Sequence, residues 1–172
     1  KVAVSTTMKM ESAATENHAN HNSHSDSTAI KPPVDTKLKV VFDTYFLLKD
    51  ALVKTDAKAA ASAAKDALTA LNAVRMGELA MDVHPVSMKE MSGSMAGDKS
   101  ISETQDIKRQ REFFISFSKS MYELIKVSKY ETPVYLQFCP MANGGKGANW
   151  LSKENVIKNP YYGSQMMTCG KT

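Results

Sequence analysis

Hydrophobic residues recur at helical spacing along most of the chain after residue 34. The first such run follows the i, i+3, i+4, i+7 rule and consists of Leu38, Val41, Phe42, Tyr45, Leu48 and Leu52. Asp35 or Thr36 is suited to the N-cap, because a short polar side chain accepts a hydrogen bond from the first helical turn. The pattern predicts an amphipathic helix from this cap to about Leu52.

A second helix is predicted from Ala57 to about Leu79, after a break at Thr55 and Asp56. This stretch is rich in alanine, which has the highest helix propensity. Its apolar face is a narrow stripe of mostly small residues, formed by Ala60, Ala64, Leu68, Leu71 and Val74. Such a stripe allows a neighbouring helix to approach closely.

Two more helices are predicted downstream. Pro85 suits the first turn of a helix that runs to about Met95, with Gly93 and Gly97 helping to end it. The sequence Ser100-Ile101-Ser102-Glu103 matches a capping box, so a long helix is expected from about Ser102 to Val127. Its apolar face is Ile107, Phe114, Phe117, Met121 and Leu124. Four amphipathic helices joined by short turns indicate an all-α fold, an antiparallel four-helix bundle.

The helical periodicity stops after Pro133. Glycines and prolines punctuate residues 133–172, and aromatic residues are scattered among them: Tyr135, Phe138, Trp150, Tyr161 and Tyr162. An irregular, Gly-, Pro- and aromatic-rich C-terminal segment packed on the bundle is therefore expected, anchored by its aromatics. The helical domain and this segment together span residues 35–172.

Residues 1–34 have a different composition. They are rich in Ser, Thr, Ala, Asn and His, and almost free of large apolar residues, which predicts a flexible tail. The tail carries His18, His21 and His24 at every third position, and Met8 and Met10. Tracts of this kind capture metal ions, although a polar leader without a metal role has the same composition.

The charge pattern limits the range of partners. The formal net charge is +4, with acidic and basic residues interleaved along the chain, so no basic block marks a nucleic-acid surface. No apolar run approaches the roughly 18–20 residues that span a bilayer. A chain that begins at Lys1 without an apolar leader is expected to be a mature or trimmed product.

The most specific chemical feature is the sulfur content of the C-terminal segment. Both cysteines of the chain lie there, and each is close to methionine, in Cys139-Pro140-Met141 and in Met166-Met167-Thr168-Cys169. Thiolate and thioether ligands favour soft ions such as Cu(I) and Ag(I). If this segment folds back on itself, Cys139, Met141, Met166, Met167 and Cys169 form a candidate soft-metal site.

A disulfide is the alternative interpretation. Two cysteines in an exported protein would close a loop of about 30 residues and stabilise it by roughly 2–4 kcal/mol. Zinc is disfavoured, because the spacing is not that of a Cys-x-x-Cys knuckle.

Weaker candidate ligands lie in the third helix. His84, Met88, Met91 and Met95 fall on one helical face, where methionines more often form core than metal sites. His84, with Met88, is the member expected to join a site if this helix faces the C-terminal segment. Near the start of the long helix, Arg109 and Arg111 are expected to be solvated or to bind coil carbonyls.

An enzyme is not expected. The tail holds three of the four histidines, no nucleophile–base–acid pattern is present, and Gly144-Gly145-Lys146-Gly147 lacks the flanking elements of a phosphate loop.

The C-terminal sequence from Val134 to Gly170 resembles a bacterial domain of unknown function, as do Gln110-Arg111-Glu112-Phe113-Phe114 and Ser118 upstream. That domain occurs alone in exported proteins and fused to the C-terminus of periplasmic adaptors of copper/silver efflux pumps. The similarity covers about residues 35–170. Met167 stands where the family more usually has leucine, which leaves open which methionine is a ligand.

The resemblance implies a periplasmic or cell-envelope domain that binds, sequesters or hands over Cu(I) or Ag(I), with an efflux-pump adaptor as a candidate partner. A cleaved signal or a lipid anchor before Lys1 are open alternatives. The competing interpretation is a non-catalytic interaction module, pinned by a disulfide, that docks on an envelope or efflux assembly.

Overall fold

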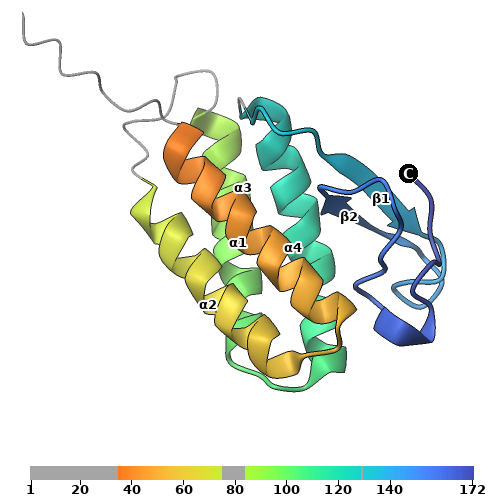
Figure 1. Cartoon of the computed structure of the whole chain (residues 1–172). Coiled ribbons are helices and arrows are strands. Elements are labelled where there is room, and N and C mark those ends of the chain that lie inside the picture. Colours follow the sequence, from red (N-terminus) through yellow and green to blue (C-terminus); the bar gives the residue numbers. More distant parts are fainter. Residues whose placement is uncertain (1–34, 75–83, 129) are drawn as a thin grey trace, which may run out of the picture. The chain divides into compact units, whose positions relative to one another are not determined.

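Four helices form the larger part of the structure (Figure 1). A computed structural model describes residues 35–74, 84–128 and 130–172, all within one unit of the chain. The helices are α1 (Asp35–Val53), α2 (Ala57–Ala73), α3 (His84–Ser102) and α4 (Ile107–Val127). Each packs against the next in the chain, which confirms the predicted four-helix bundle.

Aromatic side chains of α1 and α4 form the centre of the core. The rings of Tyr45 and Phe114 stack with centroids 5.4 Å apart, and the Phe117 ring lies 5.4 Å from Tyr45 and 6.3 Å from Phe114. All three side chains are completely buried. The Tyr45 hydroxyl pairs with the Ser118 hydroxyl at 2.9 Å and accepts a bond from the Leu151 amide at 2.9 Å. The central ring is therefore also a polar link between α1, α4 and the C-terminal segment.

The second helix begins as predicted but ends earlier. Asp56 is its N-cap, and the carboxylate accepts a hydrogen bond from the Ala59 amide at 2.9 Å. The helix ends at Ala73 instead of near Leu79, and Val74 caps it in an extended conformation. Its buried face is made almost entirely of alanines, which are Ala60, Ala63, Ala64 and Ala67, with Leu71.

The prediction that Gly93 and Gly97 end the third helix is wrong. α3 continues to Ser102, so both glycines lie in the middle of this helix, on the face that contacts α4. A Cβ added at Gly93 would lie 2.9 Å from the Ser120 hydroxyl, and one at Gly97 would lie 3.2 Å from Phe117 Cβ. These glycines therefore permit close helix packing and do not act as caps.

The predicted capping box is also wrong. Ser100, Ile101 and Ser102 form the last turn of α3, and α4 begins five residues later than expected, at Ile107. Its N-cap is Asp106, whose carboxylate accepts a hydrogen bond from the Lys108 amide at 2.9 Å. The buried Gln110 side chain fixes the turn, because its amide donates to the carbonyls of Ala57 and Thr104.

The C-terminal segment is more regular than the sequence indicates. Strands β1 (Tyr135–Cys139) and β2 (Ala148–Ser152) form an antiparallel hairpin, with Cys139 opposite Ala148 and Tyr135 opposite Ser152. Strand β2 packs against α4. A short 3-10 turn, η2 (Gly163–Gln165), follows, and Trp150 is the largest completely buried side chain of the unit.

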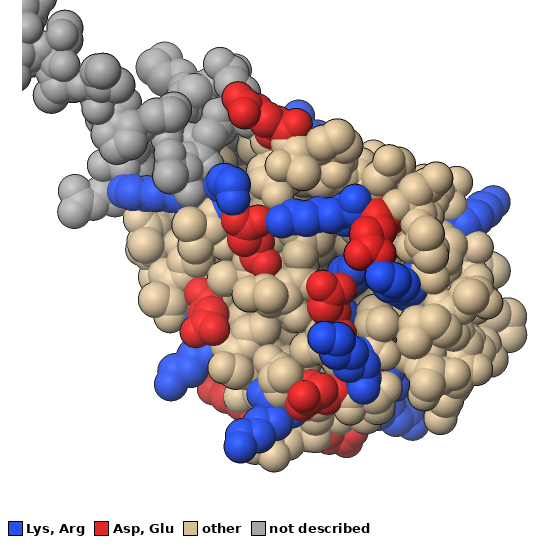
Figure 2. Space-filling model, in the orientation of Figure 1, with Lys and Arg blue, Asp and Glu red and all other residues tan. Residues whose placement is uncertain are grey.

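Charged side chains are distributed over the surface in both signs. Figure 2 shows lysines and arginines next to acidic residues, with no extended patch of one sign on that face. Several form pairs, such as Lys153 with Asp43 at 2.7 Å. No helix within the described ranges is long and apolar enough to cross a membrane.

Candidate metal centre

The fold brings the two cysteines together. Cys139 is the last residue of β1 and is completely buried, whereas Cys169 lies in the C-terminal loop and is partly exposed. Their sulfur atoms are 2.9 Å apart, and both cysteines are free thiols. Two residues that are thirty positions apart in the sequence are therefore in direct contact.

The turn between the two strands fixes Cys139. The Cys139 carbonyl accepts a bond from the Ala142 amide at 3.4 Å, and the Ala142 carbonyl accepts one from the Gly147 amide at 2.9 Å. Gly147 has a φ of +81°, and a Cβ there would lie 2.3 Å from the Phe138 ring. A side chain at this position would therefore disturb the end of β1.

Cys169 is held by the chain on both sides of it. The carbonyl of Cys169 accepts a bond of 2.7 Å from the Asn159 side-chain amide, and Asn159 is completely buried. Beyond it, Lys171 pairs with Phe138 through two backbone bonds of 2.8 and 2.9 Å. The residue before Cys139 is therefore paired with the residue two after Cys169.

Gly170 completes this arrangement. Its φ is +152°, and an added Cβ would lie 2.9 Å from the Trp150 ring and 3.0 Å from the Phe138 carbonyl. Glycine at this position lets the C-terminal loop lie against the buried Trp150 next to Cys169.

The separation of the sulfurs lies between two chemical states. A disulfide bond is about 2.05 Å long, and two thiolates around one metal ion lie about 3.5–4.5 Å apart when each metal–sulfur bond is roughly 2.3 Å. From 2.9 Å, either state requires a displacement of only about 1 Å. Because Cys169 lies in a loop, small changes in that loop are sufficient for either state.

The sulfur contact also shapes the protonation of the pair. The hydrogen bond with Cys139, helped by desolvation, raises the pKa of the Cys169 thiol above its ordinary value, and the Met141 backbone amide partly opposes this. The reduced pair therefore retains a proton at neutral pH. A metal ion that binds both sulfurs as thiolates must displace it.

The three methionines lie in the turns next to the cysteines. Met141 is 52% exposed, and the Tyr162 hydroxyl donates to its carbonyl at 2.6 Å. Met166 is 40% exposed, and its carbonyl accepts a bond from the Cys169 amide at 3.1 Å. Met167 is partly buried, and its carbonyl accepts a bond from the Asn159 amide. Two thioethers thus lie at the surface close in sequence to the thiols.

The donor set fits a soft ion better than a borderline one. A structural zinc site takes four Cys, His or carboxylate ligands. Within the ranges that the structure describes, no group of three or more His, Cys, Asp or Glu residues is placed to hold a metal. Two thiols supplemented by methionine suit Cu(I) and Ag(I).

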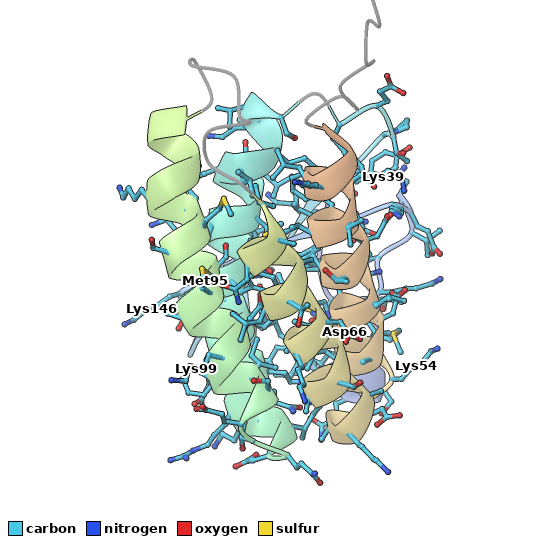
Figure 3. All side chains as sticks on the ribbon, turned by 90° about the vertical axis from the view of Figure 1, so that its left-hand side faces the viewer. Lys39, Lys54, Asp66, Met95, Lys99 and Lys146 are labelled. Atoms are coloured by element: carbon cyan, nitrogen blue, oxygen red, sulfur yellow. The ribbon has the colours of Figure 1, made fainter. Side chains whose placement is uncertain are left out.

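Of the weaker candidate metal ligands, the structure describes the side chains of only some. Met91 is buried and Met95 packs partly buried against the core on α3 (Figure 3), as the core-packing interpretation predicted. His84 and Met88 begin α3, but their side chains lie outside the described residues. The tail candidates Met8, Met10, His18, His21 and His24 also lie outside them.

Sequence reasoning missed the residues that position the site. Asn159 was not singled out, although Asn159-Pro160 is a turn signal, and Tyr162 was expected only as an aromatic anchor of the segment. For Arg111, one of the two predicted roles was to bind backbone carbonyls of the coil. Its guanidinium group donates to the carbonyl of Pro160 at 2.9 Å and to that of Leu52 at 3.0 Å. Arg109 is exposed. Arg111 thereby ties the end of α1 to the segment that carries Asn159.

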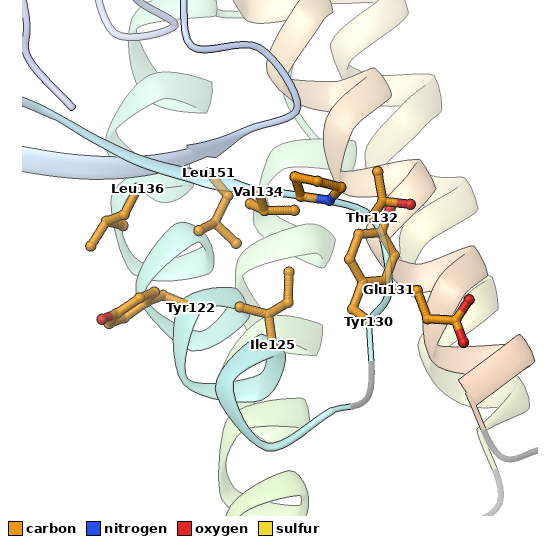
Figure 4. Close-up of a pocket in the computed structure, with 9 residues that line it drawn as sticks. Tyr122, Ile125, Tyr130, Glu131, Thr132, Val134, Leu136 and Leu151 are labelled. Atoms are coloured by element: carbon orange, nitrogen blue, oxygen red, sulfur yellow. The ribbon is translucent and has the colours of Figure 1, made fainter.

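Among the described residues, cavities lie around the hairpin, and neither cysteine lines the three that are named below. One of about 320 Å³ lies between the end of α4 and the strands, with Tyr122, Ile125, Leu136 and Leu151 around it (Figure 4). Two larger ones, of about 610 and 580 Å³, follow the outer face of α4 and share Glu112, Ile115 and Asn143.

The fold and the paired thiols define a four-helix protein with a small C-terminal hairpin that carries a two-cysteine site. The family described as "Protein of unknown function (DUF3347)" matches residues 41–132, more than half of the chain, and the chain belongs to it. No curated protein and no solved structure matches the chain. The matched residues begin within α1 and extend past α4, and both cysteines lie beyond them.

Proposed function

We propose that this protein is a non-enzymatic domain of the cell envelope that binds Cu(I) or Ag(I) between Cys139 and Cys169. The observation that supports the proposal is the 2.9 Å contact between two free thiols, next to surface methionines. Soft ions bind thiolates and thioethers in preference to the oxygen and nitrogen ligands offered elsewhere on a protein surface.

The C-terminal segment supplies the means of binding and release. Cys139 lies in a hydrogen-bonded strand, whereas Cys169 lies in a partly exposed loop. Separation of the sulfurs by about 1 Å admits a metal, and Met141, Met166 or Met167 completes the sulfur shell. Since thioethers carry no proton, they remain ligands at acidic pH.

The resemblance of the C-terminal sequence to domains fused to efflux-pump adaptors suggests the destination of the metal. In this proposal the bound ion is sequestered or handed to such an adaptor in the periplasm, and the histidines and methionines of residues 1–34 capture ions loosely beforehand.

A competition titration tests the site. Reduced protein is titrated into a chromogenic Cu(I) chelator complex, and we expect it to withdraw one equivalent of copper. The double variant Cys139→Ser with Cys169→Ser should withdraw none. Three single variants, Met141→Leu, Met166→Leu and Met167→Leu, test which methionine completes the sulfur shell. Their matched control is Met91→Leu in the buried core, which should bind copper as the wild type does. Absence of competition, or undiminished competition by the double variant, would contradict the proposal.

The second candidate is an interaction module pinned by a Cys139–Cys169 disulfide, and the same sulfur contact supports it. Counting free thiols in protein prepared without reductant distinguishes the two. An oxidised pair that resists mild reduction favours the module, and two free thiols favour the metal site.

A further inference from the structure

The two thiols are unequal in their access to solvent. Cys139, the last residue of β1, has no exposed surface, and the neighbouring Phe138 pairs with Lys171 through an isolated β-bridge. Cys169 is partly exposed, and residues 164–166 and 168 beside it are exposed as well. A reagent larger than water therefore reaches the Cys169 sulfur first.

The backbone keeps the second thiol in place behind the first. The two bonds between Phe138 and Lys171 and the bond from Asn159 to the Cys169 carbonyl hold both main chains at fixed register. With the sulfurs 2.9 Å apart, Cys139 lies close enough to attack a mixed disulfide formed on Cys169.

We propose that Cys169 is a site of covalent modification by disulfide oxidants and that Cys139 is its resolving thiol. In the first step the Cys169 thiolate attacks an external disulfide, which forms a mixed disulfide and releases one external thiolate. In the second, the Cys139 thiolate attacks the Cys169 sulfur, closes the internal disulfide and releases the second external thiolate. The pair loses two electrons and two protons, and the external disulfide gains the two electrons.

One consequence concerns the metal. The internal disulfide uses both proposed metal ligands, so its formation would release a bound soft ion. This consequence depends on the proposed function, whereas the exchange itself does not.

The test uses reduced protein, oxidised glutathione as the probe, and intact mass as the readout. Wild-type protein should pass to the internal disulfide without a lasting adduct, and Cys139→Ser should accumulate an adduct of one glutathione. Cys169→Ser should react at least tenfold more slowly than Cys139→Ser. Equal rates for the two variants, or a lasting adduct on wild type, would overturn the proposal.

A second measurement does not depend on the variants folding. Brief treatment of wild-type reduced protein with a bulky maleimide, followed by peptide mapping, should label Cys169 at least tenfold faster than Cys139. Equal labelling would overturn the assignment. A Cu(I) titration of the same sample separates the two proposals: ordered exchange without copper binding rejects only the metal function.

Discussion

The bundle and the C-terminal segment are held together by different interactions. The bundle relies on buried apolar side chains, with a ring cluster at its centre and alanine and glycine at its tight contacts. Residues 153–172 form little regular structure and rely on side-chain amides and guanidinium groups that bind backbone carbonyls, as Asn159, Gln137 and Arg111 do. The first region is therefore held by apolar packing, and the second by specific hydrogen bonds on either side of the two cysteines.

The largest expected effect comes from the carboxyl group buried in the bundle. Asp98 of α3 is completely buried, and neither oxygen has a hydrogen-bond partner among the described residues. Desolvation raises the pKa of Asp98 from 3.8 to about 8. Between about pH 4 and pH 8 the folded protein therefore holds a proton that the unfolded chain has lost, and the free energy of unfolding falls as pH rises.

At about 1.4 kcal/mol per pKa unit, Asp98 accounts for a loss of about 5 kcal/mol across this range. Urea denaturation from pH 4 to pH 8 measures it, by the difference between wild type and Asp98→Asn. Asp66→Asn, on the exposed face of α2 (Figure 3), is the control and should keep the wild-type slope. An unchanged slope in Asp98→Asn would show that this carboxyl is not the source.

The next effect concerns the aromatic cluster. Phe114→Ala removes a ring that contacts Tyr45, Phe117 and Tyr161, and should lower the free energy of unfolding by about 3–5 kcal/mol. Phe113→Ala, at the adjacent and partly exposed position, should cost less than about 1 kcal/mol. Similar losses for both, measured by chemical denaturation, would contradict the assignment of the core.

A smaller and more local effect is expected at Asn159. Asn159→Ala leaves the Cys169 carbonyl and the Tyr161 amide without their partner, and each unpaired buried group costs about 1–3 kcal/mol. Hydrogen exchange should show lost protection at Phe138 and Lys171 and retained protection in α4. Asn72→Ala, at an exposed position of α2, is the control. Uniform loss across α4 would show that the two regions unfold together.

The smallest effect distinguishes backbone strain from lack of space. Gly170→Ala introduces a Cβ against Trp150 at a φ of +152°, whereas Gly144→Ala introduces one into open space at a φ of +63°. Gly144→Ala should cost about 1 kcal/mol, and Gly170→Ala more than that. Only Gly170→Ala should also weaken Cu(I) binding, and equal copper affinities of the two variants would contradict this.

The helices were predictable because apolar periodicity reports burial directly. Predicted helix boundaries were wrong where one residue type has two structural roles. Gly93 and Gly97 resemble the glycines that end helices, but they permit close packing against α4. The motif at Ser100–Glu103 satisfied a capping rule, yet Asp106 is the cap that the chain uses.

The hairpin was missed because neither strand alternates apolar with polar residues: in β1 the buried positions are Gln137 and Cys139. In β2, Trp150, Leu151 and Ser152 are all buried, so no period of two is visible. For the site, the sequence identified the two cysteines that the fold brings together. It could not predict what Asn159 and Tyr162 do at the site, because their roles arise from contacts between residues distant in the chain.

The most direct test of the central claim, that both thiols bind one soft ion, is X-ray absorption at the copper edge. Reduced protein loaded with one equivalent of Cu(I) should show two or three sulfur neighbours at about 2.3 Å and no nitrogen or oxygen neighbour. A first shell dominated by nitrogen or oxygen, or a spectrum unchanged by Cys139→Ser with Cys169→Ser, would contradict the account.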